Sequence, residues 1–246
     1  MENFIFGIHP LMEALDSGEK PEKILFQKGL QGENYQRLFQ RVRQEKIPYQ
    51  MVPVEKLNSL TRKNHQGVIA FVSLVSYQPM TELLPMLYEQ GEVPLLVLLD
   101  RVTDVRNLGA LARSAECAGA HAIVIQEKGT APINADAIKA SAGALSRMPV
   151  CREANILETI AFLQASGLRV IACSEKGEQT IYQTDLTVPS AIILGAEDKG
   201  ISAACMKMAD QQVRIPMKGR IASLNVSVAA GVVLFEALRQ REPDLS

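Results

Sequence analysis

Residues 95–119, LLVLLDRVTDVRNLGALARSAECAG, contain the pattern that decides the fold. The run from Leu95 to Leu99 is entirely apolar, as in a strand that is buried on both faces of a parallel sheet. A polar loop follows, and the segment 108–118 has the pattern of a helix that Gly119 ends in the left-handed conformation typical of glycine. A buried strand, a polar loop and a helix in this order predict an α/β fold with a mainly parallel sheet.

The same alternation continues toward the C-terminus. We expect strands at 122–126, 169–173, 191–194 and 212–215, and helices at 135–146, 156–166, 202–208 and 224–239. The last of these helices is apolar on almost every side. This pattern predicts a helix that is fully buried, either inside the domain or at a subunit interface.

A smaller α/β unit precedes this region. Its expected elements are a helix at 8–15, a strand at 23–27, a helix at 34–45, a strand at 49–52, a helix at 54–60 and a strand at 68–75. Turn residues at 76–79 and 89–94 then bracket a helix-like segment. We therefore expect a small domain at 1–75, a linker at 76–92 and a larger domain at 93–246.

The composition is that of an ordinary globular chain. Of 246 residues, 47% are apolar and 22% are charged, and the formal net charge is −1. Apolar runs fall well short of the roughly 20 residues of a membrane helix. The four cysteines and three histidines are far apart, without the close ligand pairs of a zinc site. We expect a cytoplasmic protein with buried, reduced thiols, no metal and no membrane partner.

The charge is unevenly distributed. Residues 1–75 carry 10 Lys and Arg against 8 Asp and Glu, whereas the remaining residues carry 16 against 19. The surplus is too small to establish RNA binding, because solvated helix faces have the same composition. It indicates only that a basic face, if there is one, lies in the first domain.

Candidate chemistry gathers in the loops 100–109, 194–200 and 215–225. Ligands of open parallel sheets bind beyond the carboxyl ends of the strands, where these loops are expected. Arg113 lies among small apolar residues, and a buried guanidinium must pair or face an anionic ligand, whereas a surface arginine need not. Glu197 follows an apolar strand, so it is either a ligand-edge carboxylate or a simple helix-start residue. Ser223 is placed to cap the last helix, and Asn225 can offer a donor and an acceptor to a ligand.

Two common nucleotide motifs are missing. No GxGxxG follows an expected strand, and the chain has no GxxxxGK[ST]. Nicotinamide cofactors and nucleoside triphosphates are therefore disfavoured, and an oxidoreductase is a poor hypothesis. The residues alone indicate an α/β domain with a polar site formed by three loops.

Three motifs of the larger domain resemble those of a known family. NLGALARSA at 107–115, LGAE at 194–197, and IPM at 215–217 with SLNVSVA at 223–229 are similar to the motifs of the SpoU (TrmH-type) branch of the SPOUT RNA 2′-O-methyltransferases. The combination in this order is highly specific. Near the N-terminus, FGIHP at 6–10 and HQGV at 65–68 look like a substrate-binding domain related to ribosomal protein L30e.

The resemblance implies a homodimer whose trefoil-knotted C-terminal domain binds S-adenosylmethionine. The family's cofactor positions fall on Gly195, Ile215 and Leu224, with Met217 and Cys173 lining the pocket. Its catalytic group falls on Asn107, Arg113, Glu197, Ser223 and Asn225. Because a guanidinium stays protonated, we interpret Arg113 as a clamp for an RNA phosphate rather than as a base.

The resemblance implies 2′-O-methylation of a guanosine in 23S rRNA, and the separate first domain favours ribosomal RNA. Methylation of tRNA or of another rRNA site is an alternative, although single-domain tRNA members of the family would lack residues 1–75. A non-catalytic RNA-binding protein of ribosome assembly is an alternative of another class. The intact set of candidate catalytic residues argues against it.

Overall fold

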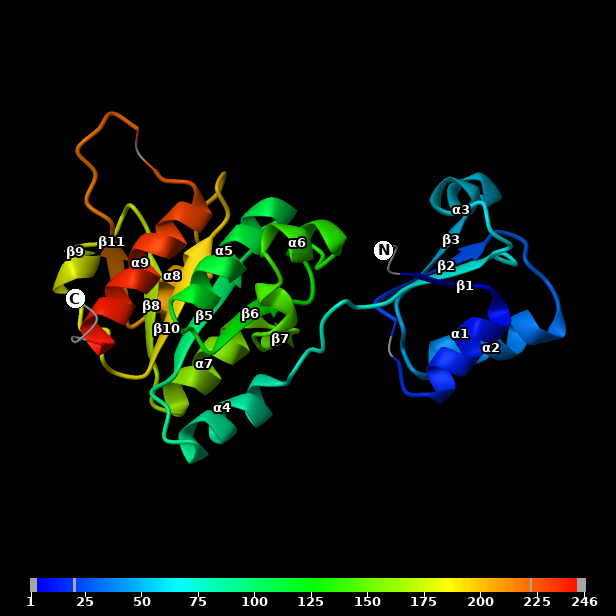
Figure 1. Ribbon diagram of the computed structural model, residues 1–246, viewed down its shortest axis with the longest axis horizontal. Coiled ribbons are helices and arrows are strands. Elements are labelled where there is room, and N and C mark those ends of the chain that lie inside the picture. Colours follow the sequence, from blue (N-terminus) through cyan, green and yellow to red (C-terminus); the bar gives the residue numbers. More distant parts are fainter. Residues whose placement is uncertain (1–3, 20, 222, 243–246) are drawn as a thin grey trace. The chain divides into compact units, whose positions relative to one another are not determined.

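A computed structural model describes residues 4–19, 21–221 and 223–242 and divides the chain into two compact units, 1–74 and 75–246 (Figure 1). Within these ranges, none of the helices is both long enough and apolar enough to cross a membrane.

The first unit is a four-stranded sheet with helices on both faces. Its elements are β1 (Phe4–Phe6), α1 (Ile8–Asp16), β2 (Lys23–Gln27), α2 (Glu33–Gln44), β3 (Tyr49–Val52), α3 (Val54–Leu60) and β4 (Val68–Phe71). The strand order is β1-β4-β2-β3, and only the β2–β3 pair is parallel. Leu11 of α1 and Leu38 of α2 pack on one face of the sheet, and Leu57 of α3 packs on the other. Strand β1 was not predicted, because three residues are too few to show an alternation.

The second unit is a seven-stranded sheet between two layers of helices. Its elements are α4 (Met80–Glu89), β5 (Leu95–Asp100), α5 (Val105–Cys117), β6 (Ala122–Gln126), α6 (Ala135–Ala140), the 3-10 helix η1 (Ala144–Ser146), β7 (Val150–Glu153), α7 (Ile156–Ala165), β8 (Arg169–Cys173), β9 (Gln179–Thr180), the 3-10 helix η2 (Ile181–Gln183), β10 (Ser190–Gly195), α8 (Ala203–Met208), β11 (Gln211–Arg214) and α9 (Val226–Arg241). The strand order is β7-β6-β5-β10-β8-β11-β9, and every neighbouring pair is parallel.

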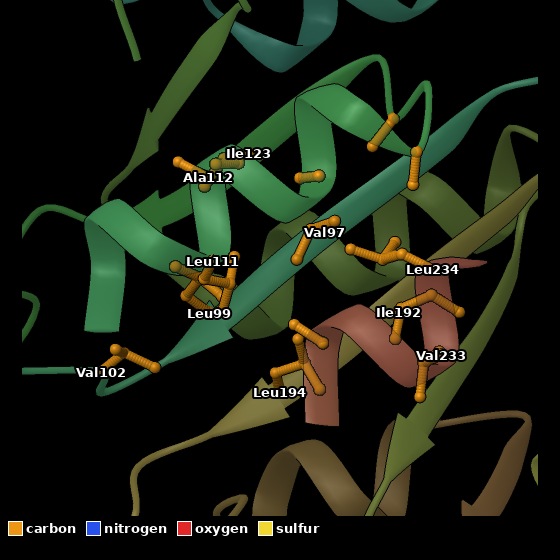
Figure 2. Close-up of a cluster of buried hydrophobic side chains, with 14 of the residues drawn as sticks. Val97, Leu99, Val102, Leu111, Ala112, Ile123, Ile192, Leu194, Val233 and Leu234 are labelled. Atoms are coloured by element: carbon orange, nitrogen blue, oxygen red, sulfur yellow. The ribbon is translucent and has the colours of Figure 1, made fainter. Parts of the chain in front are cut away.

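The apolar run of β5 contributes to two cores, because successive side chains of a strand point to opposite faces of the sheet. Leu95, Val97 and Leu99 belong to the core beneath α5 and α9. Leu96 and Leu98 belong to the core beneath α4 and α7. Figure 2 shows part of the first core, where side chains of the central strands meet those of α5 and α9. Burial on both faces explains why the strand has no polar residue before Asp100.

The segment 76–92, which we expected to be a linker, belongs to the second unit in the structure. Helix α4 lies within it and buries Met80, Leu83, Leu84 and Leu87 in the core that it shares with α7. Flanking turn residues suggested a boundary here. They mark the two ends of a docked helix instead.

Two other predictions differ from the structure. The helix expected at 135–146 stops at Ala140, because Ala142 and Gly143 have positive φ angles of 50° and 88° before η1 begins. The last helix, expected to be buried on every side, packs on α5 and the sheet but leaves Val228 52% and Phe235 50% exposed. Its apolar outer face has no covering element in the described part of this chain.

Gly109 lets α5 approach α6 closely. A Cβ atom at this position would lie 2.5 Å from Cβ of Ala140 and 2.7 Å from the carbonyl oxygen of Ala137. Gly109, one of the small residues of the NLGALARSA motif, is therefore required for the packing of α5 against α6.

We predict that Gly109→Ala destabilises the protein. Overpacking costs about 1–3 kcal/mol and the gain in helix propensity is at most about 1 kcal/mol, so the free energy of unfolding should fall by about 1–2 kcal/mol. Urea denaturation measures this change. Glu116→Ala, at an exposed position of the same helix, should change stability by less than about 0.5 kcal/mol. Equal stability of the two variants would contradict the packing argument.

Candidate active site

Strands β8, β10 and β11 end at one edge of the parallel sheet (Figure 1). A cavity opens there. Its volume is about 370 Å³, within the range of roughly 300–1,000 Å³ of small-ligand sites. Its walls come from the turn 173–176 after β8, the loop 194–201 after β10, and residues between 215 and 229 that lead from β11 into α9.

The predicted cofactor residues come together in this cavity. All five line it: Cys173, Gly195, Ile215, Met217 and Leu224. From the predicted catalytic group, Glu197 and Ser223 line it as well. The walls combine apolar side chains, such as those of Leu194 and Val226, with carboxylates and lysines at the opening. Such walls suit a ligand with a flat apolar part and polar ends.

Asn225 connects the three motifs by hydrogen bonds. Its amide nitrogen donates to Oδ1 of Asn107 at 3.0 Å and also to Oε1 of Glu197. Its Oδ1 accepts from the backbone N–H of Ser227 at 2.9 Å and from the hydroxyl of that residue. Asn107 and Asn225 are 118 residues apart in the sequence. One amide therefore brings the first, second and third motifs together.

The role of Asn225 differs from the one we predicted. It is the N-cap of α9, which begins at Val226, so the prediction that Ser223 caps this helix is wrong. An amide has two N–H donors and two acceptor lone pairs, and all four are used within the protein. Asn225 is thus a positioning residue, and Ser223 is an exposed residue of the cavity wall.

Glu197 is held by one of its two carboxylate oxygens. Oε1 accepts from Asn225, and among the described residues no protein group donates to Oε2. The carboxylate is exposed at the cavity. It can therefore accept a hydrogen bond from a bound hydroxyl without losing its own support.

Arg113 is exposed on α5, so of the two alternatives that the sequence left open it is the surface arginine. The neighbouring Ala112 and Ala115 are the residues that face the core. Arg113 is absent from the cavity wall and has no acidic partner within the described residues. Its cation is thus available to an anion that comes from the solvent.

The glycine of the LGAE motif is needed by the loop itself. A Cβ atom on Gly195 would lie 2.2 Å from the carbonyl carbon of Gly200, and Ala196 forms an antiparallel bridge with Gly200. The loop folds back on itself directly after β10. This turn is what directs Glu197 toward the cavity.

One wall of the cavity and the role of one buried carboxylate were not predicted from the sequence. The turn Ser174–Lys176 lines the cavity and directly follows β8, so the strand-end rule applied to a fourth strand would have found it. Asp100 is 1% exposed, and its Oδ2 accepts from the backbone N–H of Ser202 at 2.6 Å. This bond ties the end of β5 to the segment after β10. The signal was an acidic residue that ends an otherwise apolar strand.

Burial raises the pKa values of three cysteine thiols, one of which lines the cavity. Burial, with the nearby carboxylate of Glu175, raises the pKa of Cys173 to about 12, so its thiol stays protonated at physiological pH. Burial also raises the pKa of Cys151 to about 12 and raises that of Cys205. Cys117, in contrast, is exposed, which differs from the expectation that all four thiols are buried.

Comparisons with known proteins support the same region. A family model described as "SpoU rRNA Methylase family" matches residues 94–235, and one described as "RNA 2′-O ribose methyltransferase substrate binding" matches residues 4–78. The chain is 37% identical over 245 residues to the 23S rRNA (guanosine-2′-O-)-methyltransferase RlmB of Photorhabdus laumondii, covering 98% of this chain and 99% of that relative.

Solved structures are also similar. An AdoMet-bound rRNA methyltransferase from Sinorhizobium meliloti is 28% identical with a TM-score of 0.62, covering 96% of this chain and 86% of that chain. The A. aeolicus TrmH/SpoU tRNA modifying enzyme is 29% identical with a TM-score of 0.57, covering 62% of this chain and 78% of that chain. These likenesses confirm the predicted fold class, a SPOUT-type domain with a parallel sheet preceded by a small α/β domain.

We predict that Asn225→Asp keeps the helix cap but makes stability depend on pH. Aspartate is as good an N-cap as asparagine, but it places a second carboxylate beside Glu197. Protonation of either carboxylate relieves the repulsion, so this variant should gain stability relative to the native chain as the pH falls from 7 to 5. Urea midpoints at the two pH values measure the gain.

Asn225→Ala is the matched control. It removes the cap without adding charge, so it should lose about 1 kcal/mol at both pH values. If the two variants respond alike to pH, Asn225 and Glu197 are not in contact.

Proposed function

This chain belongs to the SpoU rRNA methylase family, and from that premise we propose that it transfers the methyl group of S-adenosylmethionine to a ribose 2′-hydroxyl of ribosomal RNA. The observation that carries the proposal is the hydrogen-bonded set of Asn107, Asn225 and Glu197 beside the cavity that the predicted cofactor residues line. A group that can receive a hydroxyl proton is thus adjacent to a site for a methyl donor.

The cavity fits the cofactor in size and in the chemistry of its walls. We propose that Ile215, Met217 and Leu224 contact the apolar face of the adenosyl group, and that the backbone around Cys173 and Gly195 holds its polar atoms. When bound, S-adenosylmethionine supplies a methyl group on a positively charged sulfur. The main task of the protein is then alignment, which can contribute roughly 7–11 kcal/mol to the rate.

Glu197 is proposed to receive the hydrogen bond of the target hydroxyl. Its Oε2 is available while Asn225 fixes Oε1, so the carboxylate has one orientation. A positioned base of this kind contributes about 10²- to 10⁴-fold. Ser223, on the same cavity wall, is proposed to orient the ribose. Arg113 is proposed to clamp the RNA phosphate, because its guanidinium is exposed and without a carboxylate partner among the described residues.

We propose that the substrate is 23S rRNA, at a guanosine. The similarity to RlmB extends over nearly the whole of both chains, whereas the solved tRNA-modifying enzyme covers only 62% of this chain. The first unit is proposed to bind the RNA, since a substrate-binding model matches residues 4–78. A cytoplasmic location follows for a bacterial-type rRNA enzyme. Modification of tRNA remains the alternative substrate, and an RNA-binding protein without catalysis is the alternative of another class.

A homodimer through the methyltransferase unit is part of the proposal. Val228, Val232 and Phe235 follow one another at helical spacing on α9, and the outer two are about half-exposed. An apolar stripe of this kind on a helix is typical of a subunit contact. Val226 and Ala229 of the same helix line the cavity, so a contact on α9 also supports the site.

The experiment that tests the function combines two assays. Methyl transfer to 23S rRNA should fall by roughly 10²- to 10⁴-fold in Glu197→Gln and to the detection limit in Arg113→Ala. Calorimetric binding of S-adenosylmethionine should be unchanged in both, because neither side chain is assigned to the cofactor. Arg147→Ala, an exposed arginine away from the cavity wall, is the control and should be fully active.

Several outcomes would contradict the proposal. Absence of cofactor binding by the native chain would refute the enzyme assignment. Mapping of 2′-O-methyl groups in cellular RNA with and without the protein decides between 23S rRNA and tRNA. Full activity of Arg113→Ala would remove the phosphate clamp.

We predict that Phe235→Glu separates the protein into monomers. A carboxylate buried within an apolar contact costs several kcal/mol, enough to dissociate a dimer at micromolar concentration. Sedimentation velocity measures the mass of the species in solution. Tyr182→Glu, at a tyrosine that is 54% exposed on η2, should leave that mass unchanged. A native chain that sediments as a monomer would refute the dimer.

A further inference from the structure

Four aromatic rings form a continuous cluster at one side of the first unit. Phe26 of β2 packs edge-on against Tyr35, Phe39 and Tyr49, with ring centroids 5.6, 5.5 and 6.1 Å away. Tyr35 and Phe39 of α2 stack at 5.5 Å, and Phe39 meets Tyr49 at 5.1 Å. The rings lie where α2 runs beside β3, which is an edge strand of the sheet.

The cluster is buried at its base and open at its top. Phe26 is fully buried. Tyr35 and Phe39 are partly exposed, and Tyr49 is 42% exposed. The core of this unit needs the base of the cluster but not an exposed ring on an edge strand. Tyr49 packs against Phe26 and Phe39 and leaves the rest of its ring open to the solvent.

A tyrosine hydroxyl and an unpaired arginine accompany the cluster on α2. Burial and the neighbouring Tyr49 raise the pKa of Tyr35, so its hydroxyl stays neutral and can donate a hydrogen bond. Tyr35, Phe39 and Arg43 succeed one another at four-residue intervals, which places them along one side of α2. Arg41 is engaged with Asp16 and Glu45, whereas Arg43 is exposed and has no acidic partner within the described residues.

We propose that this surface, formed by Tyr35, Phe39, Tyr49 and Arg43, stacks an unpaired base of the RNA substrate and contacts its phosphate. The inference rests on the proposed function and specifies where the first unit holds the RNA. Exposed aromatic rings stack on bases of any sequence, and a neighbouring arginine neutralises the backbone. Single-stranded segments, rather than helices, offer such bases.

The chemistry favours RNA over a protein partner. An apolar contact with a protein partner would not need an unpaired cation beside the rings. Here Arg43 follows Tyr35 and Phe39 on the same side of α2. Two of the three rings, those of Tyr35 and Tyr49, carry hydroxyls that can hydrogen-bond to base edges while the ring faces stack. The contribution of base stacking to RNA affinity should not change with salt concentration. The contribution of the phosphate contact should fall as the salt concentration rises.

The test measures binding of the full-length chain to a short single-stranded RNA that carries one 2-aminopurine, without cofactor. Stacking quenches this fluorescent base, and the protein contains no tryptophan to interfere. Tyr49→Leu should weaken binding by roughly 5- to 100-fold and abolish the quenching, as expected for one lost stack. Tyr49→Phe, which keeps the ring, should bind and quench like the native chain.

Two matched measurements separate the parts of the surface. On an RNA of the same length with abasic sites, the native chain and Tyr49→Leu should bind equally. Arg43→Gln should weaken binding to both RNAs and lower the salt dependence by about one phosphate contact. Tyr182→Leu, at an exposed tyrosine of the second unit, should not change binding.

The proposal is overturned if Tyr49→Leu binds as tightly as the native chain, or if its defect persists on the abasic RNA. The proposal is also overturned if the native chain binds a duplex of the same sequence as tightly as the single strand. An unchanged melting temperature of Tyr49→Leu excludes misfolding as the cause of a defect. Because no methyl transfer is measured, a failure of stacking and a failure of the enzymatic function are distinguishable.

Discussion

Parallel pairing of β10 between β5 and β8 is the constraint on which the rest of the second unit depends. A strand from late in the chain is inserted between two earlier ones. All three then end at the same edge, and loops that are distant in sequence become neighbours there. Apolar side chains on both faces of these strands stabilise the arrangement, because helices cover the central strands on each face of the sheet.

Asn225 turns this shared edge into a site. Its amide holds Asn107 and Glu197 while its carbonyl oxygen caps α9. Folding of the last helix and orientation of the carboxylate are thus coupled through one side chain. Gly195 and Asp100 support it from the second motif and from the end of β5, by a tight turn and a buried hydrogen bond. Precise orientation of few groups suits a reaction in which alignment provides most of the acceleration.

The two units divide the work in the function that we propose. The second holds the methyl donor and the reacting hydroxyl, and its outer helix α9 offers the contact for a second copy. The first contributes an aromatic and basic surface that recognises RNA without the cofactor. The chain as a whole is nearly neutral, and in this proposal only a limited part of its surface needs to attract a polyanion.

Sequence alone determined the class of fold, because strands buried on both faces must be continuously apolar and amphipathic helices must repeat their apolar side. Motif resemblance determined the family and the five predicted cofactor residues, all of which line the cavity. Tertiary structure decided what local patterns cannot contain: that α4 docks instead of linking, that Asn225 rather than Ser223 caps α9, and that Arg113 is exposed. Each of these depends on which distant surface a segment meets. A sequence pattern indicates that a residue is buried or hydrogen-bonded. Which residue it contacts is determined only when the strands assemble into the sheet.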